Sequence, residues 1–441
     1  MGDLLQDILL LSSAPGFDAR LDTLRSTILS AARLAGYDSK ENQTVVTILH
    51  EVAEQGDDAV ARYTEKFDGV KLRPDQFRVT REALEEAHGT IDARLLESLR
   101  KAIRNVRAYQ EKIFIGDRRE LSQGTGIRYT PIRRVGVCAP GAAAPLPSTV
   151  IMTVVPAQVA GVKEIAVVSP PRFEGTIHPV ILAVCHELKV EEVYRLGGVQ
   201  AVGALAHGTQ TIAKVDKIVG PGNKWVQAAK KNVAGDYVGI DSIAGPSEVL
   251  ILANSEANPT WVAADMLSQA EHAPGSAVVF TDNVDLAKKV MTELKDQVER
   301  LGRSDSTRAC LEQYSAIIVF AGLDEAVAVA NDFASEHLEI QCGQASRAIA
   351  ERIKNAGAIF IGPYTPVAVG DYWAGPSHTL PTGQTAKFFS PLSSNDFIKS
   401  SSIIEYDRAM LTKAADDIVR LARTEGLDAH ARSIEIRREK P

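Results

Sequence analysis

Residues 164–208 read "EIAVVSPPRFEGTIHPVILAVCHELKVEEVYRLGGVQAVGALAHG", and this stretch decides the fold class. It contains two short apolar segments, each closed by a turn rich in glycine or proline and each followed by a helical pattern. Short apolar strands that alternate with helices predict a parallel sheet covered on both faces. The turns after the strands lie at the edge where open α/β sheets bind ligands.

The same alternation extends outward from this stretch. It begins at Val135 and continues to about Asp241, and a second series of similar layout runs over residues 247–363. We therefore predict an α/β protein with two Rossmann-like parallel-sheet domains and small helical segments at the N- and C-termini. Neither domain contains GxGxxG, the sequence of the usual dinucleotide-binding turn.

The composition is that of an ordinary globular protein. The chain has 441 residues, of which 45% are hydrophobic and 24% charged, and its net charge of -7 gives no reason to expect nucleic acid. The four cysteines form no CxxC pair, which argues against a disulfide framework and against a thiolate zinc cluster. The acidic N-terminus differs from a signal peptide, and no apolar run is long enough to cross a bilayer. We expect a cytoplasmic protein with no nucleic-acid or membrane partner.

Two segments contain side chains suited to a metal site. In "DMLSQAEHAPG", residues 265–275, Gln269 and His272 stand three apart at the end of a predicted helix, so both project from one face. The turn-rich segment 369–383 contains Asp371, which could be an oxygen ligand for a divalent cation. An aspartate in such a segment also suits an Asx-turn, so the residue type alone leaves both interpretations open.

Three further motifs are candidates for catalysis or binding. Glu336 and His337 are adjacent at a helix-to-strand junction and offer two proton-transfer groups, although a solvated glutamate beside a partly buried histidine is an alternative. The turn "GPGN" at 220–223 could hold a phosphate or ribose with its backbone amides, or it could be purely structural. Ser247 follows a Gly-Pro turn but lacks a GxSxG elbow, so we do not interpret it as a nucleophile.

Taken together and in order, six stretches resemble the histidinol dehydrogenase family over essentially the whole chain. They are "VDKIVGPGNKWVQAAKK", "GIDSIAGPSEVLILA", "ADMLSQAEHAPGS", "SEHLEIQ", "GDYWAGPSHTLPTG" and "EGLDAHARSIEIR". The resemblance implies zinc-dependent oxidation of L-histidinol through L-histidinal to L-histidine with two NAD+, the last step of histidine biosynthesis. It also implies one Zn2+ per site and a homodimer with a shared active site.

The resemblance assigns roles residue by residue. His337 would accept the hydroxyl proton, and Glu336 would activate water for the second oxidation. The implied zinc ligands are Gln269, His272, Asp371 and His430. The implied substrate-binding residues are Ser247, Gln269, His272, His337, Asp371, His378, Glu425 and His430, and the implied cofactor-binding residues are Cys138, Gln200 and Asn223. By themselves, Glu425 and His430 suit an ordinary helix end at a glycine.

The resemblance and the patterns together suggest four parts. We expect residues 22–128 and 245–390 to form a first Rossmann-like domain that carries the metal and catalytic residues. Residues 129–244 would form a second Rossmann-like domain on the NAD side. Residues 1–21 would be an N-terminal helical segment, and residues 391–441 a tail domain that reaches the partner subunit, being too small to bury a core alone.

One position departs from the family pattern. Many members have a tyrosine in contact with the nicotinamide cofactor where this chain has Cys138, and "APGAAAPLPST" lacks the second glycine common after the PG. Two alternatives therefore stand beside histidinol dehydrogenase: a paralogous NAD-dependent dehydrogenase of another amino alcohol or sulfonated diol, and a zinc-stabilised scaffold without activity. Retention of His378, Glu425 and His430 favours histidinol as substrate. The presence of Glu336 and His337 argues against the scaffold.

Overall fold

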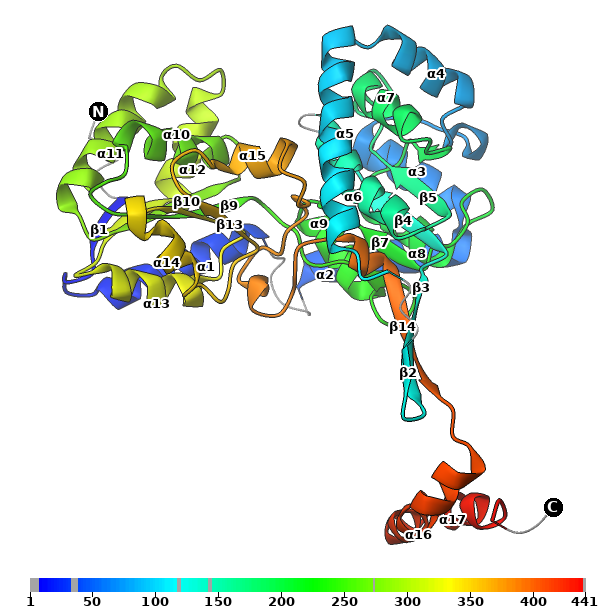
Figure 1. The fold of residues 1–441 in the computed structure, drawn as a ribbon. Helices are drawn as coiled ribbons and strands as arrows, with labels where there is room; N and C mark the ends of the chain where they lie inside the picture. The colour runs from blue at the N-terminus through cyan, green and yellow to red at the C-terminus, as the bar shows by residue number, and fades with distance from the viewer. Residues whose placement is uncertain (1–7, 33–38, 117–119, 142–144, 273, 439–441) are drawn as a thin grey trace. The chain divides into compact units, whose positions relative to one another are not determined.

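The computed structural model describes residues 8–32, 39–116, 120–141, 145–272 and 274–438. The chain forms two compact units, the first comprising Met1–Phe114 and Ile132–Phe397, the second Ile115–Pro131 and Ile398–Pro441. The first unit contains two parallel sheets (Figure 1). Among the described residues, no helix is long and apolar enough to cross a membrane.

The first sheet has five parallel strands in the order β6-β5-β4-β7-β8. Its strands are β4 (Arg134–Cys138), β5 (Glu164–Val168), β6 (Glu192–Tyr194), β7 (Lys217–Val219) and β8 (Gly239–Ile240), joined in turn by α6 (Pro147–Val159), α7 (Pro179–Glu187), α8 (Gly198–His207) and α9 (Lys224–Val233). The quoted stretch 164–208 thus forms β5, α7, β6 and α8, as predicted.

The second sheet has six parallel strands in the order β1-β11-β10-β9-β12-β13. Its strands are β1 (Leu9–Leu11), β9 (Glu248–Ala253), β10 (Ser276–Thr281), β11 (Ala316–Val319), β12 (His337–Gln341) and β13 (Ala358–Ile361). Apart from the edge strand β1, both sheets place five successive strands in the order third, second, first, fourth, fifth. The predicted α/β fold with two Rossmann-like sheets is confirmed.

Two helical layers cover the six-stranded sheet because its strands alternate their side chains between the faces. On β9, Val249 and Ile251 pack toward one layer, whereas Leu250 and Leu252 pack toward the other. The first layer contains α10 (Pro259–Ala270), α11 (Val284–Val298) and α12 (Ser304–Tyr314); the second contains α1 (Phe17–Ala32), α13 (Leu323–Phe333) and α14 (Ser346–Ala350) (Figure 1). A short helix, α15 (Val367–Tyr372), follows β13.

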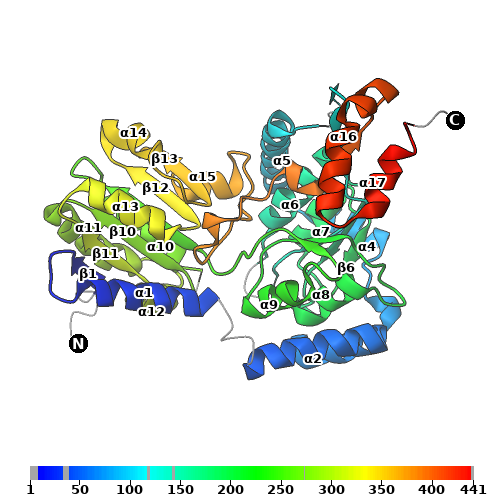
Figure 2. The ribbon, with the colours of Figure 1, turned by 90° about the horizontal axis from the view of Figure 1, so that it is seen from below.

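The helices of the N-terminal region pack on a different sheet from the one we expected. We grouped residues 22–128 with 245–390, but α2 (Lys40–Gln55) and α3 (Asp57–Asp68) pack on α8, while α4 (Arg81–Thr90) packs on α7 and α5 (Ala93–Ile113) on α6 (Figure 2). They therefore cover the helices of the five-stranded sheet, and the apolar faces of α2 and α3 join its core. An amphipathic pattern shows that a helix has a partner without identifying it.

The expected N-terminal helical segment also differs from the structure. Within residues 1–21, β1 is a strand that pairs with β11 and α1 begins at Phe17. Residues 1–7 lie outside the described part of the chain.

The second unit is small. An antiparallel sheet in the order β14-β3-β2 is formed by β2 (Glu120–Ser122), β3 (Thr125–Pro131) and β14 (Ile398–Ile404), and α16 (Arg408–Thr424) packs on α17 (Asp428–Glu435). We predicted a tail over 391–441 and no strand within it. The helices bury few apolar side chains, and Ile404, Leu421 and Ile436 are exposed. This agrees with a segment too small to form a core of its own.

Candidate active site

The candidate site lies at the amino edge of the six-stranded sheet, where β12 begins. Helix α13 ends at Ala334, whose left-handed φ of 49° turns the chain toward the strand. The Ser335 hydroxyl donates to the carbonyl of His337 over 2.9 Å, which fixes the turn that presents Glu336 and His337. A Cβ on Gly357 would clash with the Glu336 carbonyl oxygen, so only glycine permits this close approach. Both predicted catalytic side chains are buried.

The contacts of His337 define which ring nitrogen carries a proton. Its Nδ1 lies 3.0 Å from the carbonyl oxygen of Glu248 and 3.3 Å from Glu336 Oε2, so Nδ1 is the donor. Its Nε2 lies 3.7 Å from Asp371 Oδ1 and has no hydrogen-bond partner among the described residues. The imidazole is therefore oriented by its neighbours with Nε2 left available for proton transfer.

Neighbouring negative charges outweigh burial in setting the pKa of His337. Burial acts to lower the pKa of His337, but the negative charges of Glu336 and Asp371 raise it well above the ordinary value. Burial conversely acts to raise the pKa of Asp371, yet its interaction with His337 and the charges of His378 and His272 hold it below the ordinary value. The structure thus brings Glu336, His337 and Asp371 into one electrostatic cluster with the two other histidines nearby.

Asp371 and His378 are positioned by close packing of the segment that follows β13. A Cβ on Gly370 would lie 2.7 Å from the ring of Phe360, so glycine is required where α15 crosses β13. His378 Nε2 lies 3.2 Å from the Thr149 hydroxyl of α6, and burial lowers the pKa of His378. Burial therefore favours the neutral form of this predicted substrate-binding residue, although the charges of Asp371 and Glu336 act in the opposite direction.

Gln269 lies in the last turn of α10, and His272 follows two residues after the helix ends. Gln269 is only 2% exposed, and its Oε1 is buried without a hydrogen-bond partner among the described residues. Burying an amide oxygen without a hydrogen-bond partner costs free energy, and a ligand bound to that oxygen would offset the cost. His272 is exposed, and its N–H donates to the Gln269 carbonyl over 3.2 Å. The helix end thus presents one buried oxygen and one accessible imidazole.

The described residues contain no group of three or more His, Cys, Asp and Glu side chains that could hold a metal ion. The predicted ligand set includes a glutamine, and its fourth member, His430, belongs to the second unit. Glu425 caps the C-terminus of α16, and His430 lies in α17. Both side chains are exposed. Their assembly with Gln269, His272 and Asp371 remains a prediction.

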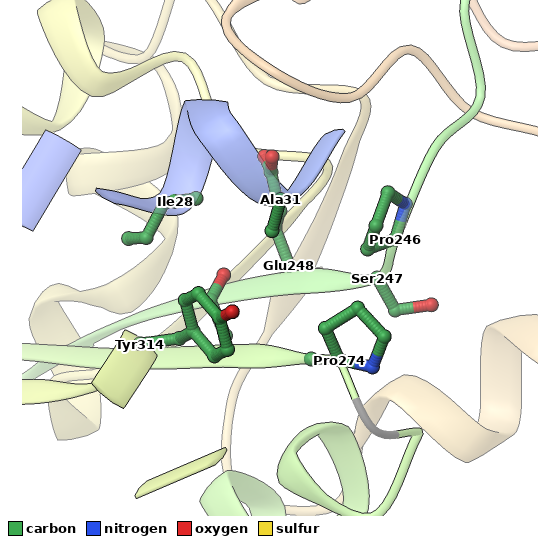
Figure 3. Close-up of a pocket in the computed structure, with 9 residues that line it drawn as sticks. Ile28, Ala31, Pro246, Ser247, Glu248, Pro274 and Tyr314 are labelled. Carbon is green, nitrogen blue, oxygen red and sulfur yellow. The ribbon is translucent and has the colours of Figure 1, made fainter. Parts of the chain in front are cut away.

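A small pocket lies beside the start of β9 and β10 (Figure 3). Its lining includes Ser247, Glu248, Pro274 and, from α1, Ile28. Glu248 was missed by sequence reasoning, although a lone glutamate opens the apolar strand "VLILA". Its backbone N–H donates to Glu336 Oε2 and its Oε1 accepts from Gly383 N, each over 2.8 Å. Burial and the charge of Glu336 raise the pKa of Glu248 to about 7.

The predicted cofactor-binding residues lie at the carboxyl edge of the five-stranded sheet. Cys138 ends β4, and burial raises the pKa of its thiol to about 11. Asn223 follows β7 and caps α9, accepting from the N–H groups of Trp225 and Val226. Gln200 is fully buried in α8, and its Oε1 has no hydrogen-bond partner among the described residues. Their contacts with a cofactor remain predictions.

Comparison with known proteins identifies the family. Residues 32–438 match the family profile described as histidinol dehydrogenase. Histidinol dehydrogenases of Geobacillus kaustophilus and Bacillus subtilis are each 46% identical, over 95% and 90% of this chain and 97% and 93% of their own lengths. A crystal structure of histidinol dehydrogenase from Elizabethkingia anophelis is 31% identical, with a TM-score of 0.88 over 97% of this chain and 98% of that one.

These matches define the chain as an α/β enzyme of the NAD-dependent oxidoreductase class. It belongs to the histidinol dehydrogenase family, as the six stretches predicted. The relatives do not favour the alternative of a dehydrogenase for another amino alcohol or a sulfonated diol.

Proposed function

We propose that the chain oxidises L-histidinol through L-histidinal to L-histidine with two NAD+, as the last step of histidine biosynthesis. The observation that carries this proposal is His337, buried with Nδ1 engaged and Nε2 available, directly beside Glu336 and Asp371. Membership of the family supports the choice of substrate. All four cysteines are free and buried, which supports a cytoplasmic location.

The residues fit one zinc ion per site. The unpartnered Oε1 of Gln269, the accessible ring of His272 and the Asp371 carboxylate form a mixed oxygen and nitrogen donor set suited to a catalytic zinc. Together with His430 they would hold the ion. When bound, it would supply a Lewis acid that anchors the imidazole and amine of the substrate.

The protein side chains divide the two oxidations between them. In the first, the neutral form of His337, which its raised pKa makes the minor form near neutral pH, takes the hydroxyl proton at Nε2 while the carbinol hydride passes to NAD+, giving the aldehyde, NADH and the protonated imidazole. In the second, Glu336 takes a proton from water as it adds to the aldehyde, and the hydrate gives a second hydride to NAD+ and becomes the carboxylic acid. Ser247, His378 and Glu425 would line the substrate pocket, and Cys138, Gln200 and Asn223 would contact the cofactor.

The proposed assembly is a homodimer with a shared site. The exposed apolar side chains of the second unit, Ile404, Leu421 and Ile436, support its packing on a partner. Mixing inactive His430→Ala subunits with inactive His337→Ala subunits should then restore part of the activity, because a mixed dimer can form one complete site. No recovery after demonstrated subunit exchange would contradict the shared site.

The direct test of the proposed function is NADH formation at 340 nm with L-histidinol, before and after chelation and zinc restoration, with histidine quantified in the same samples. We expect two NADH per histidine, loss of turnover with the metal and recovery with zinc. No turnover by folded, zinc-loaded dimer would overturn the choice of substrate, and full turnover after verified metal removal would overturn the zinc assignment.

A further inference from the structure

A second acidic cluster lies on the same face of β12 as His337. Glu339 follows His337 by two residues along the strand and is 1% exposed. Its carboxyl group is hydrogen-bonded to that of Asp265 on α10. The Gln341 side-chain amide donates to Asp265 Oδ2 over 2.7 Å and to Glu339 Oε2 over 3.0 Å. The proposed reaction uses none of these three residues.

The cluster connects the three elements that carry the predicted metal ligands of the first unit and His337. Asp265 precedes Gln269 by one turn of α10, so both lie on one helix face. Glu339 Oε1 accepts from the N–H of Val367 over 2.9 Å, and Val367 begins α15, four residues before Asp371. One hydrogen-bonded unit therefore fixes α10, β12 and α15 relative to one another.

The cluster holds a proton. Two carboxyl groups can share a hydrogen bond only if one of them is protonated. Burial and the neighbouring charge of Asp265 raise the pKa of Glu339 to about 8; burial also raises the pKa of Asp265, but its hydrogen bond to Glu339 acts to lower it. Glu339 is thus the donor and Asp265 the acceptor near neutral pH, and every oxygen of Glu339 is engaged.

We infer that Asp265, Glu339 and Gln341 are positioning residues that set the spacing of Gln269, Asp371 and His337 for the metal ion. Such outer contacts orient metal ligands, and their loss commonly lowers metal affinity by about 10- to 100-fold. The inference rests on the proposed zinc site, and it adds residues that act on that site without touching the ion.

The test is the zinc affinity of the full-length protein, measured by competition with a chromophoric chelator and compared for a matched pair of variants. Glu339→Gln keeps an acceptor for Val367 and a donor toward Asp265 and loses only the acceptor for the Gln341 amide, whereas Glu339→Met has similar volume and loses all three contacts. We expect Glu339→Met to lower zinc affinity by about 10- to 100-fold. The amide variant should stay within about threefold of the parent, since both key contacts persist. Activity titrated with zinc should show the same order of activation constants.

Folding is checked by circular dichroism and thermal unfolding in every variant. If Glu339→Met does not fold, Gln341→Met, which removes only the bridging amide, takes its place, with weaker zinc binding as the expected result. A folded Glu339→Met or Gln341→Met variant that binds zinc as tightly as the parent would overturn the inference. Equal losses of zinc affinity in Glu339→Gln and Glu339→Met would overturn it as well. If the parent protein itself binds no zinc, the proposed metal site is wrong, and so is the inference that rests on it.

Discussion

The two parallel sheets of the first unit have the same strand order, yet their predicted site residues lie at opposite edges. In the five-stranded sheet, Cys138 and Asn223 follow β4 and β7, so they lie at the carboxyl edge, where the strand order reverses. In the six-stranded sheet, Glu248 and His337 begin β9 and β12, the equivalent pair of strands, so the candidate catalytic residues lie at the amino edge.

This difference shows that strand order alone does not determine which edge of a sheet carries a site. The side chains and helix ends at each edge determine it. At the carboxyl edge, helix N-termini present backbone N–H groups, which suit the phosphates of a dinucleotide. At the amino edge, strand starts and helix C-termini meet, and α10 ends there with Gln269. Side-chain acids and imidazoles can gather at that edge without competing for a phosphate site.

The two sheets also differ in how they bury charge. Behind the turn at 220–223, Lys230 and Asp241 form an ion pair with side chains 0% and 2% exposed, and Lys230 also donates to the Gly220 carbonyl over 2.9 Å. The six-stranded sheet instead buries carboxyl groups without a basic partner, Glu248 and Glu339, whose pKa values are raised. In the five-stranded sheet the buried charges are paired, whereas in the six-stranded sheet burial favours the protonated forms of Glu248 and Glu339.

The largest expected effect is at the amino edge of the six-stranded sheet. Glu336→Gln should lower the rate of acid formation by about 10²- to 10⁴-fold, because the amide cannot take a proton from water. The measurement is histidine formed per unit time at saturating L-histidinol and NAD+. Glu351→Gln, an exposed glutamate on the same sheet's helical layer, is the control and should retain the parent rate. A parental rate in Glu336→Gln would contradict the water-activation role.

A comparable free-energy effect, on stability, is expected at the carboxyl edge of the five-stranded sheet. Lys230→Met leaves Asp241 buried without its cation and should lower the free energy of unfolding by about 3–5 kcal/mol. Denaturant unfolding measures it, with Lys163→Met at the exposed position just before β5 as the control. The control should change stability by less than about 0.5 kcal/mol. Equal effects of the two substitutions would show that the ion pair does not stabilise this edge.

The arrangement within each sheet could be predicted from sequence because it depends on local patterns. Runs such as "EIAVV" and "VLILA" are apolar on both faces and identify buried parallel strands. The partner of α2–α5 could not be predicted in this way, because an amphipathic helix packs on any apolar surface of suitable shape. Strand β14 was missed because its sequence "IKSSSII" is polar and its side chains are mostly exposed.

The candidate site was predictable to the extent that its residues lie in short motifs. The pair Glu336 and His337 is adjacent in sequence and in space. Glu248 and Glu339 were missed because each is the one acid of a buried strand, and only the fold brings them to Glu336 and Asp265. A lone buried acid in such a strand is itself a signal, since it requires a partner or a proton.

The buried acids predict a pH-dependent stability that the ion pair does not. The pKa of Glu248 is raised from 4.5 to about 7 in the folded state, so between these values the folded protein holds a proton that the unfolded chain has lost. Stability should therefore fall as pH rises through this window, by up to about 1.4 kcal/mol per pH unit from this group, and level off above it.

The Glu248→Gln variant tests this contribution. The amide keeps an acceptor for the Gly383 N–H but cannot ionise, so its stability should decline less steeply than that of the parent between pH 4.5 and 7. Urea unfolding at several pH values measures the difference, with Glu351→Gln as the control. Parallel profiles of Glu248→Gln and the parent would show that Glu248 does not hold a proton in the folded state.

The smallest effect is expected at Cys138, where many family members have tyrosine. Burial raises the pKa of this thiol to about 11, so it is neutral at assay pH and Cys138→Ala removes no charge. The contact that its backbone makes with the turn at Gly220 is also kept, because a side-chain change leaves the carbonyl in place. We therefore expect the KM for NAD+ to change by less than about threefold, as for loss of one small apolar group. Cys185→Ala, a buried thiol in α7, is the matched control for packing loss alone. A rise of tenfold or more in KM with Cys138→Ala, and none with Cys185→Ala, would show that the thiol itself contacts the cofactor and that the carboxyl edge uses side chains as the amino edge does.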